Sequence, residues 1–132
     1  MAKILVIEDQ PRVRELLVDI LVSDGHEVLA AADGRVGLEL YARECPALVI
    51  TDLLIPGISG LELVARLCQV PGLKVIAVSG SGVTSLEAAR RVGATVTLAK
   101  PFSVTQVLTA VRQLLGNGPP AGGRLRPPQL PS

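Results

Sequence analysis

The sequence contains few aromatic residues, a single histidine, two cysteines and no excess of charge of either sign. Aromatic residues make up 2% of the 132 residues, namely Tyr41 and Phe102, which argues against an exposed platform for stacking bases. One histidine excludes a multi-histidine metal site, and two cysteines are too few for a zinc knuckle. The formal net charge of +1 gives no electrostatic reason to expect direct contact with nucleic acid.

Long hydrophobic runs are also missing. The first apolar run, residues 4–7, is interrupted at once by Glu8 and Asp9. A signal peptide needs a longer run and a membrane span needs about 20 apolar residues. We therefore expect a cytoplasmic protein with no membrane partner, in which Cys45 and Cys68 stay reduced as small core or near-core residues.

Short apolar runs alternate along the chain with segments of helical period, and hydrophobic residues make up 48% of the whole. The runs do not alternate apolar and polar residues, as half-exposed strands do, so they predict strands that are covered on both faces. The predicted strands are residues 4–7, 28–32, 47–50, 75–78 and 95–99.

Five helices are predicted between and after these strands. The first starts near Pro11 and ends near Gly25, and the second spans about residues 34–44 with Asp33 as its cap. The other three begin with a capping-box pattern, a hydroxyl residue followed three positions later by Glu or Gln. These pairs are Ser59 with Glu62, Thr84 with Glu87, and Ser103 with Gln106. The pattern predicts an α/β fold, a doubly wound five-stranded parallel sheet with helices on both faces.

The composition changes near Gly116. We expect one domain over residues 1–116, followed by a glycine- and proline-rich disordered tail or truncated linker over residues 117–132. Two of the 13 basic residues and none of the 12 acidic residues lie in that last segment, so the domain itself carries a net charge of −1. The segment is too short for an output domain, so we expect the chain to act through another protein unless it is a fragment.

Polar side chains follow four of the five predicted strands. Glu8 and Asp9 follow the first strand, Asp52 the third, Ser79 the fourth and Lys100 the fifth. Parallel strands bring their carboxyl ends to one edge of a sheet, where ligand sites form. A strand order of 2-1-3-4-5, as in flavodoxin-like folds, would gather all five side chains in one crevice.

These groups suit phosphoryl chemistry. Three clustered acids repel one another, and oxygen ligands with room for water favour Mg²⁺ as the compensating cation. A carboxylate at a strand end can attack phosphorus and become an aspartyl phosphate. The Ser79 hydroxyl and the Lys100 ammonium could then bind phosphoryl oxygens.

Four motifs in this order resemble the receiver domain of bacterial two-component response regulators, over roughly residues 2–116. Each motif alone is weakly specific, whereas all four at the right strand ends are highly specific. They are Glu8-Asp9 and the segments at residues 52–60 (DLLIPGISG), 78–80 (VSG) and 99–102 (AKPF).

The resemblance implies a role for each site residue. Asp52 would be the phosphoacceptor, and Ser79 would carry the hydroxyl that moves toward the phosphoryl group. Lys100 would form an ion pair with the phosphoryl group. A histidine kinase or phosphotransfer protein would donate the phosphoryl group, and a downstream protein would respond. The Lys100-Pro101 bond would be cis, as in the family. The implied Mg²⁺ ligands are Glu8, Asp9, Asp52 and the backbone carbonyl of Leu54.

One position departs from the family pattern. Thr97 stands where receivers usually have Tyr or Phe, a ring whose burial changes when the hydroxyl moves. Ser79 and Thr97 are therefore the predicted switch positions. We expect a protein that assists only its own phosphorylation and dephosphorylation rather than an enzyme.

Two alternatives stay open. The first is a pseudo-receiver, a protein-binding module on the same fold that transfers no phosphate. The second is a phosphatase of the haloacid dehalogenase type. Such a phosphatase has its nucleophile after the first strand, whereas here the acidic pair comes first and position 54 is Leu54 rather than an acid.

Overall fold

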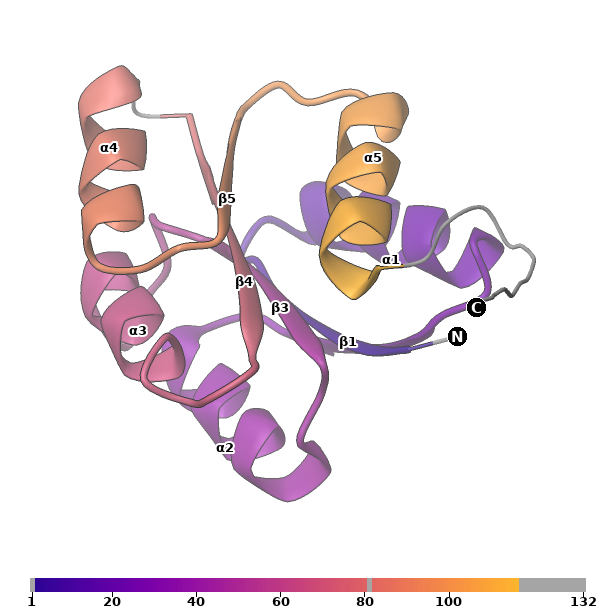
Figure 1. Ribbon diagram of the computed structural model, residues 1–132, viewed down its shortest axis with the longest axis horizontal. Helices are drawn as coiled ribbons and strands as arrows, with labels where there is room; N and C mark the ends of the chain where they lie inside the picture. The colour runs from indigo at the N-terminus through magenta and orange to yellow at the C-terminus, as the bar shows by residue number, and fades with distance from the viewer. Residues whose placement is uncertain (1, 81, 117–132) are drawn as a thin grey trace.

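A five-stranded parallel sheet forms the centre of the molecule (Figure 1). The computed structural model describes residues 2–80 and 82–116, and the predicted tail at 117–132 lies outside the described residues. The strand order is β2-β1-β3-β4-β5, which confirms the predicted fold class. The strands are β1 (Lys3–Ile7), β2 (Glu27–Ala31), β3 (Leu48–Asp52), β4 (Lys74–Ser79) and β5 (Val96–Ala99).

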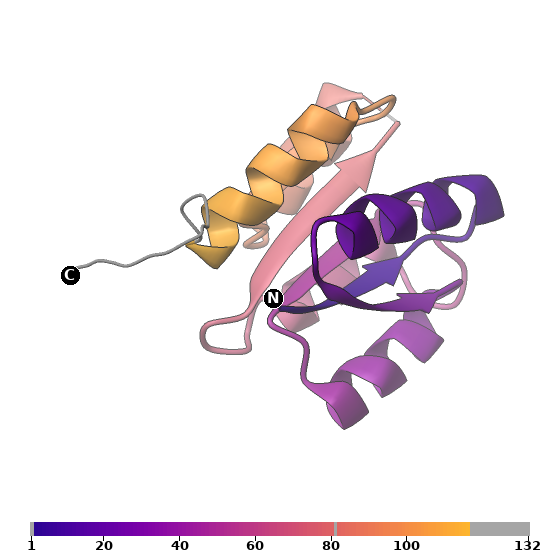
Figure 2. The same cartoon turned by 90° about the vertical axis from the view of Figure 1, so that its right-hand side faces the viewer.

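Helices cover both faces of this sheet. Helices α1 and α5 lie on one side, and α2, α3 and α4 lie on the other (Figures 1 and 2). Among the described residues, no helix is long and apolar enough to cross a membrane. The helices are α1 (Pro11–Ser23), α2 (Gly34–Glu44), α3 (Gly60–Leu67), α4 (Val83–Arg91) and α5 (Val104–Leu115).

Two hydrophobic clusters, one on each face, explain why the strands are continuously apolar. In β1, Ile4 and Val6 pack with α1 and α5, whereas Leu5 and Ile7 pack on the other side with α2 and α3. All four side chains are fully or almost fully buried. Every position of the strand therefore needs an apolar residue, and the rigid strands fix the residues that follow them.

Several helix starts agree with the sequence. Asp33 accepts a hydrogen bond from a backbone N–H in the first turn of α2, at 2.8 Å. Ser59 accepts one at the start of α3, at 3.5 Å. At α5 the capping box is complete, because Ser103 Oγ accepts from the Gln106 N–H at 3.0 Å while the Gln106 side chain accepts from the Ser103 N–H at 2.8 Å. These three caps were predicted and are confirmed.

Two sequence predictions are wrong. Thr84 does not cap α4, because Gly82 turns the chain with φ +101° and the helix already begins at Val83. Cys45 is not in the core: it ends α2 with a left-handed backbone conformation, φ +47°, and its side chain is exposed. Cys68 is half-buried, and burial raises the pKa of its thiol.

Candidate functional site

The carboxyl ends of the strands meet at one edge of the sheet. Asp52 is paired with Val78 on β4, and Ser79 is paired with Ala99 on β5. Glu8 directly follows β1, the neighbour of β3. Each candidate residue thus stands on a strand or within two residues of its end, so the rigid strands set its position.

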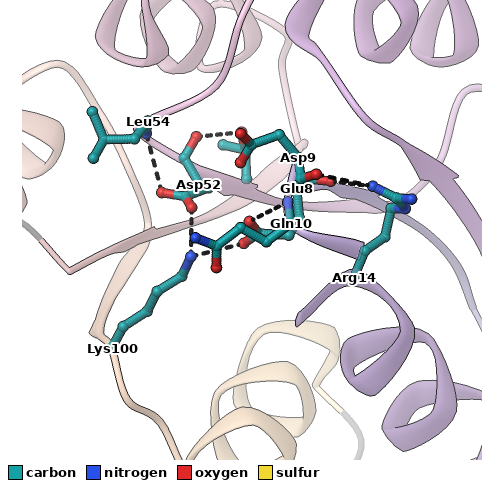
Figure 3. A network of polar contacts seen from close by, with 8 residues as sticks. Glu8, Asp9, Gln10, Arg14, Asp52, Leu54 and Lys100 are labelled. Carbon is teal, nitrogen blue, oxygen red and sulfur yellow. Dashed lines mark hydrogen bonds and ion pairs between the residues drawn. The ribbon is translucent and has the colours of Figure 1, made fainter. Parts of the chain in front are cut away.

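Three carboxylates converge at this edge (Figure 3). One oxygen from each of Glu8, Asp9 and Asp52 lies within 4.8 Å of the other two, close enough for all three to bind a single metal ion. Glu8 and Asp52 are buried, with exposed fractions of 1% and 5%, whereas Asp9 is exposed. The cluster therefore opens to solvent on the Asp9 side.

Lys100 brings the positive charge predicted for the site. Its Nζ lies 2.6 Å from Asp52 Oδ2 and 3.0 Å from Glu8 Oε1, so one ammonium pairs with two buried carboxylates. Figure 3 shows the side chain reaching across the edge of the sheet to both acids. The Lys100-Pro101 bond is cis, as the resemblance implies.

Burial and pairing shift the ionisation of this cluster. Burial raises the pKa of Glu8, although hydrogen bonds from Lys100 and from the Gln10 N–H act against that shift. For Lys100, burial alone would lower the pKa, but the hydrogen bonds to Asp52 and Glu8 outweigh it and raise the pKa. The lysine is therefore held in its charged form beside the acids.

Backbone groups hold the two buried acids in place. The Gln10 N–H donates to Glu8 Oε2 at 3.1 Å, and the Leu54 N–H donates to Asp52 Oδ1 at 3.0 Å. Arg14, on α1, donates to the carbonyl oxygen of Glu8 at 2.9 Å. Sequence reasoning missed Gln10 and Arg14. Gln10 contributes its backbone N–H, which any residue except proline has, so its residue type gave no signal. Arg14 binds a carbonyl six positions away, a contact that no sequence motif marks.

The two predicted switch positions lie on neighbouring strands and differ in burial. Ser79 is buried at the end of β4 with 1% exposure. Thr97 is half-buried on β5, and its Oγ1 accepts a hydrogen bond from Arg90 Nη2 of α4 at 2.8 Å. At the position where the family usually carries an aromatic ring, this chain therefore ties β5 to α4 through a hydrogen bond.

The charge balance of the site favours a divalent cation. With all groups ionised, the cluster holds three negative charges and one positive charge, an excess of two negative charges at one edge of the sheet. Carboxylate oxygens are the ligands that hard cations such as Mg²⁺ prefer. A carboxylate held beside an ammonium also suits attack on phosphorus, because the ammonium can then bind the phosphoryl oxygens.

Curated proteins with similar sequences include regulators of bacterial signalling. The chain is 31% identical to sporulation initiation phosphotransferase F of Bacillus subtilis, over 86% of this chain and 93% of that protein. It is 37% identical to the response regulator protein FleR of Pseudomonas aeruginosa, over 89% of this chain but only 26% of FleR. The chain thus spans nearly the whole length of the first relative and about a quarter of the second.

Solved structures agree with the sequence matches. A putative response regulator from Chloroflexus aurantiacus superposes with a TM-score of 0.82 and 30% identity, over 88% of this chain and 98% of that one. The family model described as the response regulator receiver domain matches residues 4–112, which includes every candidate site residue named above. Receiver domains are the signalling modules of two-component systems. This chain belongs to the response regulator receiver domain family.

Proposed function

We propose that the chain is a phosphorylation-dependent signalling switch whose phosphoacceptor is Asp52. The observation that carries this proposal is the contact of Lys100 Nζ with Asp52 Oδ2 inside a cluster of three carboxylates. The donor would be a histidine kinase or a histidine phosphotransfer protein, and the response would pass to a downstream protein. We also propose residues 1–116 as the phosphoacceptor domain, which the family match over residues 4–112 supports.

The chemistry needs few groups. An oxygen of the Asp52 carboxylate attacks the phosphorus of a phosphohistidine, the bond from phosphorus to the imidazole nitrogen breaks, and an acyl phosphate forms on Asp52. Lys100 would bind a phosphoryl oxygen in place of Asp52 Oδ2, to which it is now paired. Ser79 would donate its hydroxyl to another phosphoryl oxygen.

Mg²⁺ is the cofactor that this donor set fits. It would supply positive charge that offsets the negative charge of the acids and of the incoming phosphoryl group. Its proposed ligands are the carboxylates of Glu8, Asp9 and Asp52 and the backbone carbonyl of Leu54. Glu8 is nearly fully buried and Asp9 is exposed, so one proposed ligand would come from the protein interior and another from the solvent-exposed surface.

Phosphorylation would act by shifting the balance between two conformations. The new charge draws the Ser79 hydroxyl inward, and the adjoining loops and α4 move with it. Thr97, bonded to Arg90 of α4, would take the place of the usual ring in that movement. Within this proposal the chain assists its own phosphorylation and dephosphorylation and turns over no other substrate.

The phosphatase alternative loses support at position 54. A phosphatase of that type needs an acid there to protonate the leaving group, whereas Leu54 has an apolar side chain that is 66% exposed. The pseudo-receiver alternative predicts that the protein binds a partner but accepts no phosphoryl group. The assembled pair of Lys100 and Asp52 favours the phosphoacceptor instead.

The test is labelling by a small phosphodonor. The protein is incubated with acetyl phosphate and Mg²⁺, and its intact mass is compared with that of Asp52→Asn and of a remote control, Asp19→Asn on α1. We expect the mass of one phosphoryl group on the wild type and on the Asp19 variant, none on the Asp52 variant, and none in EDTA. Equal labelling of all three proteins would refute Asp52 as the acceptor. A wild type that takes no phosphoryl group from acetyl phosphate or from phosphorylated histidine phosphotransfer proteins would support the pseudo-receiver.

A further inference from the structure

The start of α2 lies against the loop that follows β3, residues 53–59, with no room for a side chain at Gly34. A Cβ at position 34 would overlap Ile58 Cγ2 and would lie 3.2 Å from Ile55 Cδ1. Gly34 has no unusual backbone angle, so it is the space and not the conformation that requires glycine here. Both neighbours belong to the same loop, so a side chain at position 34 would displace the side chain of Ile58, which packs this loop against α2.

A hydrogen bond fixes the same contact. The Gly34 N–H donates to the Pro56 carbonyl oxygen at 3.1 Å. At the far end of the loop, Gly60 begins α3 so close to the backbone of Leu53 that a Cβ there would overlap the Leu53 carbonyl oxygen. The loop is therefore held on one side by α2 and at its end by α3, and neither contact tolerates an added methyl group without movement.

This loop carries a proposed Mg²⁺ ligand. The Leu54 carbonyl shares its peptide unit with the nitrogen of Ile55, one of the two residues packed on Gly34. The Leu54 N–H, in turn, binds Asp52 Oδ1 at 3.0 Å. Leu54 stands between Leu53, whose backbone packs against Gly60, and Pro56, whose carbonyl accepts from the Gly34 N–H, so a displacement of this loop would move the Leu54 carbonyl.

We propose that Gly34 is a positioning residue for the Mg²⁺ site. By leaving space for Ile55 and Ile58, it lets α2 hold the loop where the Leu54 carbonyl can act together with the acid cluster. The inference rests on the proposed function, since it assumes that the site takes Mg²⁺. It also gives a role to the segment that follows β2, which places no side chain among the three carboxylates and Lys100.

Direct Mg²⁺ binding to the unphosphorylated protein tests this inference. Isothermal titration calorimetry with MgCl₂ is performed on the wild type and on Gly34→Ala. Groups that orient metal ligands cost roughly 10- to 100-fold in affinity when lost, and we expect about tenfold weaker binding because the three carboxylates remain. Labelling by acetyl phosphate should then need more Mg²⁺ but should recover at saturating concentrations.

Two further variants separate positioning from loss of stability. Gly93→Ala lies in the turn before β5, at the edge of the sheet opposite the acid cluster, where φ is +118° and a Cβ would lie 2.8 Å from Cys68 Cβ. It should destabilise the fold yet leave the Mg²⁺ affinity within about twofold of the wild type. The double variant Gly34→Ala/Ile58→Ala removes the overlapping atoms and should restore most of the affinity.

The outcomes distinguish this inference from the proposed function. A wild type that neither binds Mg²⁺ nor takes a phosphoryl group would overturn the proposed function. If the wild type does both, only the role of Gly34 would be overturned by Gly34→Ala binding Mg²⁺ as tightly as the wild type, or by Gly93→Ala binding it as weakly as Gly34→Ala. If Gly34→Ala does not fold, Ile58→Ala tests the same contact from the loop side: we expect weaker Mg²⁺ binding, and unchanged affinity would overturn the inference.

Discussion

Replacing Lys100 with methionine removes an ammonium that lies between two buried carboxylates. Its Nζ is 2.6 Å from Asp52 and 3.0 Å from Glu8, and these acids are 5% and 1% exposed. Removing one partner of a buried ion pair typically costs about 3–5 kcal/mol, because the remaining charge is left uncompensated. The Lys100 side chain is 19% exposed and Glu8 can take up a proton, and both facts reduce the cost. We therefore expect Lys100→Met to lower the free energy of unfolding by about 2–3 kcal/mol, somewhat less than this range.

That loss can be measured by thermal unfolding. For a domain of this size it corresponds to a fall in Tm of about 10 °C, followed by far-UV circular dichroism because the chain has no Trp and a single Tyr. The fall should be greatest in EDTA and should shrink on addition of Mg²⁺. It should also shrink as the pH is lowered, because burial already raises the pKa of Glu8, and protonation of Glu8 relieves the repulsion.

A second lysine provides the control for this prediction. Lys3, at the start of β1, pairs with Glu44 at 3.1 Å, but both side chains are about one-third exposed. Lys3→Met should lower the Tm far less than Lys100→Met, and Mg²⁺ should not change the difference. The electrostatic account of the site would be refuted if the two variants unfolded alike, or if Mg²⁺ left the deficit of Lys100→Met unchanged.

Two further predictions concern stability away from the site. Ser103→Ala should lower the free energy of unfolding by about 1 kcal/mol, because it removes a complete capping box. Thr84→Ala should change this free energy little, because Thr84 does not cap α4. Equal losses of the two variants in urea unfolding would contradict the assigned helix starts. His26 Nδ1 accepts a hydrogen bond from the Ala2 N–H, and its Nε2 lies 3.5 Å from Asp24. Burial lowers the pKa of His26 in the folded protein, so the unfolded chain takes up a proton more readily. The stability of the fold should therefore decrease as the pH falls below about 6.5. The Tm advantage of the wild type over His26→Asn should therefore narrow as the pH falls from about 7.5 to about 5.5, and a constant advantage would show that His26 is not the titrating group.

The fold could be predicted because its strands are buried on both faces. In a run such as residues 4–7, every position must be apolar, and this leaves a pattern that no half-exposed strand shows. The cluster of acids and lysine could also be predicted, because the ends of parallel strands share an edge whatever the loops do. The site is thus encoded in which residue follows each strand.

Other features depend on contacts that local sequence does not reveal. Thr84 fits a capping pattern, but the chain turns two residues earlier, at Gly82, so the helix begins before Thr84 can cap it. Cys45 has the residue type of a core position, yet it ends a helix in a left-handed conformation and faces solvent. The contact of Gly34 with Ile58 joins residues 24 positions apart, and only their spatial packing shows that glycine is required there.

Chemical trapping of the phosphorylated residue tests the central claim most directly. Sodium borohydride reduces an acyl phosphate on aspartate to the alcohol, which marks that residue as homoserine in a peptide map. After treatment with acetyl phosphate and Mg²⁺, the account predicts homoserine at position 52 in the wild type and at no acidic residue in a parallel sample kept in EDTA. Reduction at Glu8 or Asp9 instead of Asp52, or equal reduction with and without Mg²⁺, would contradict it.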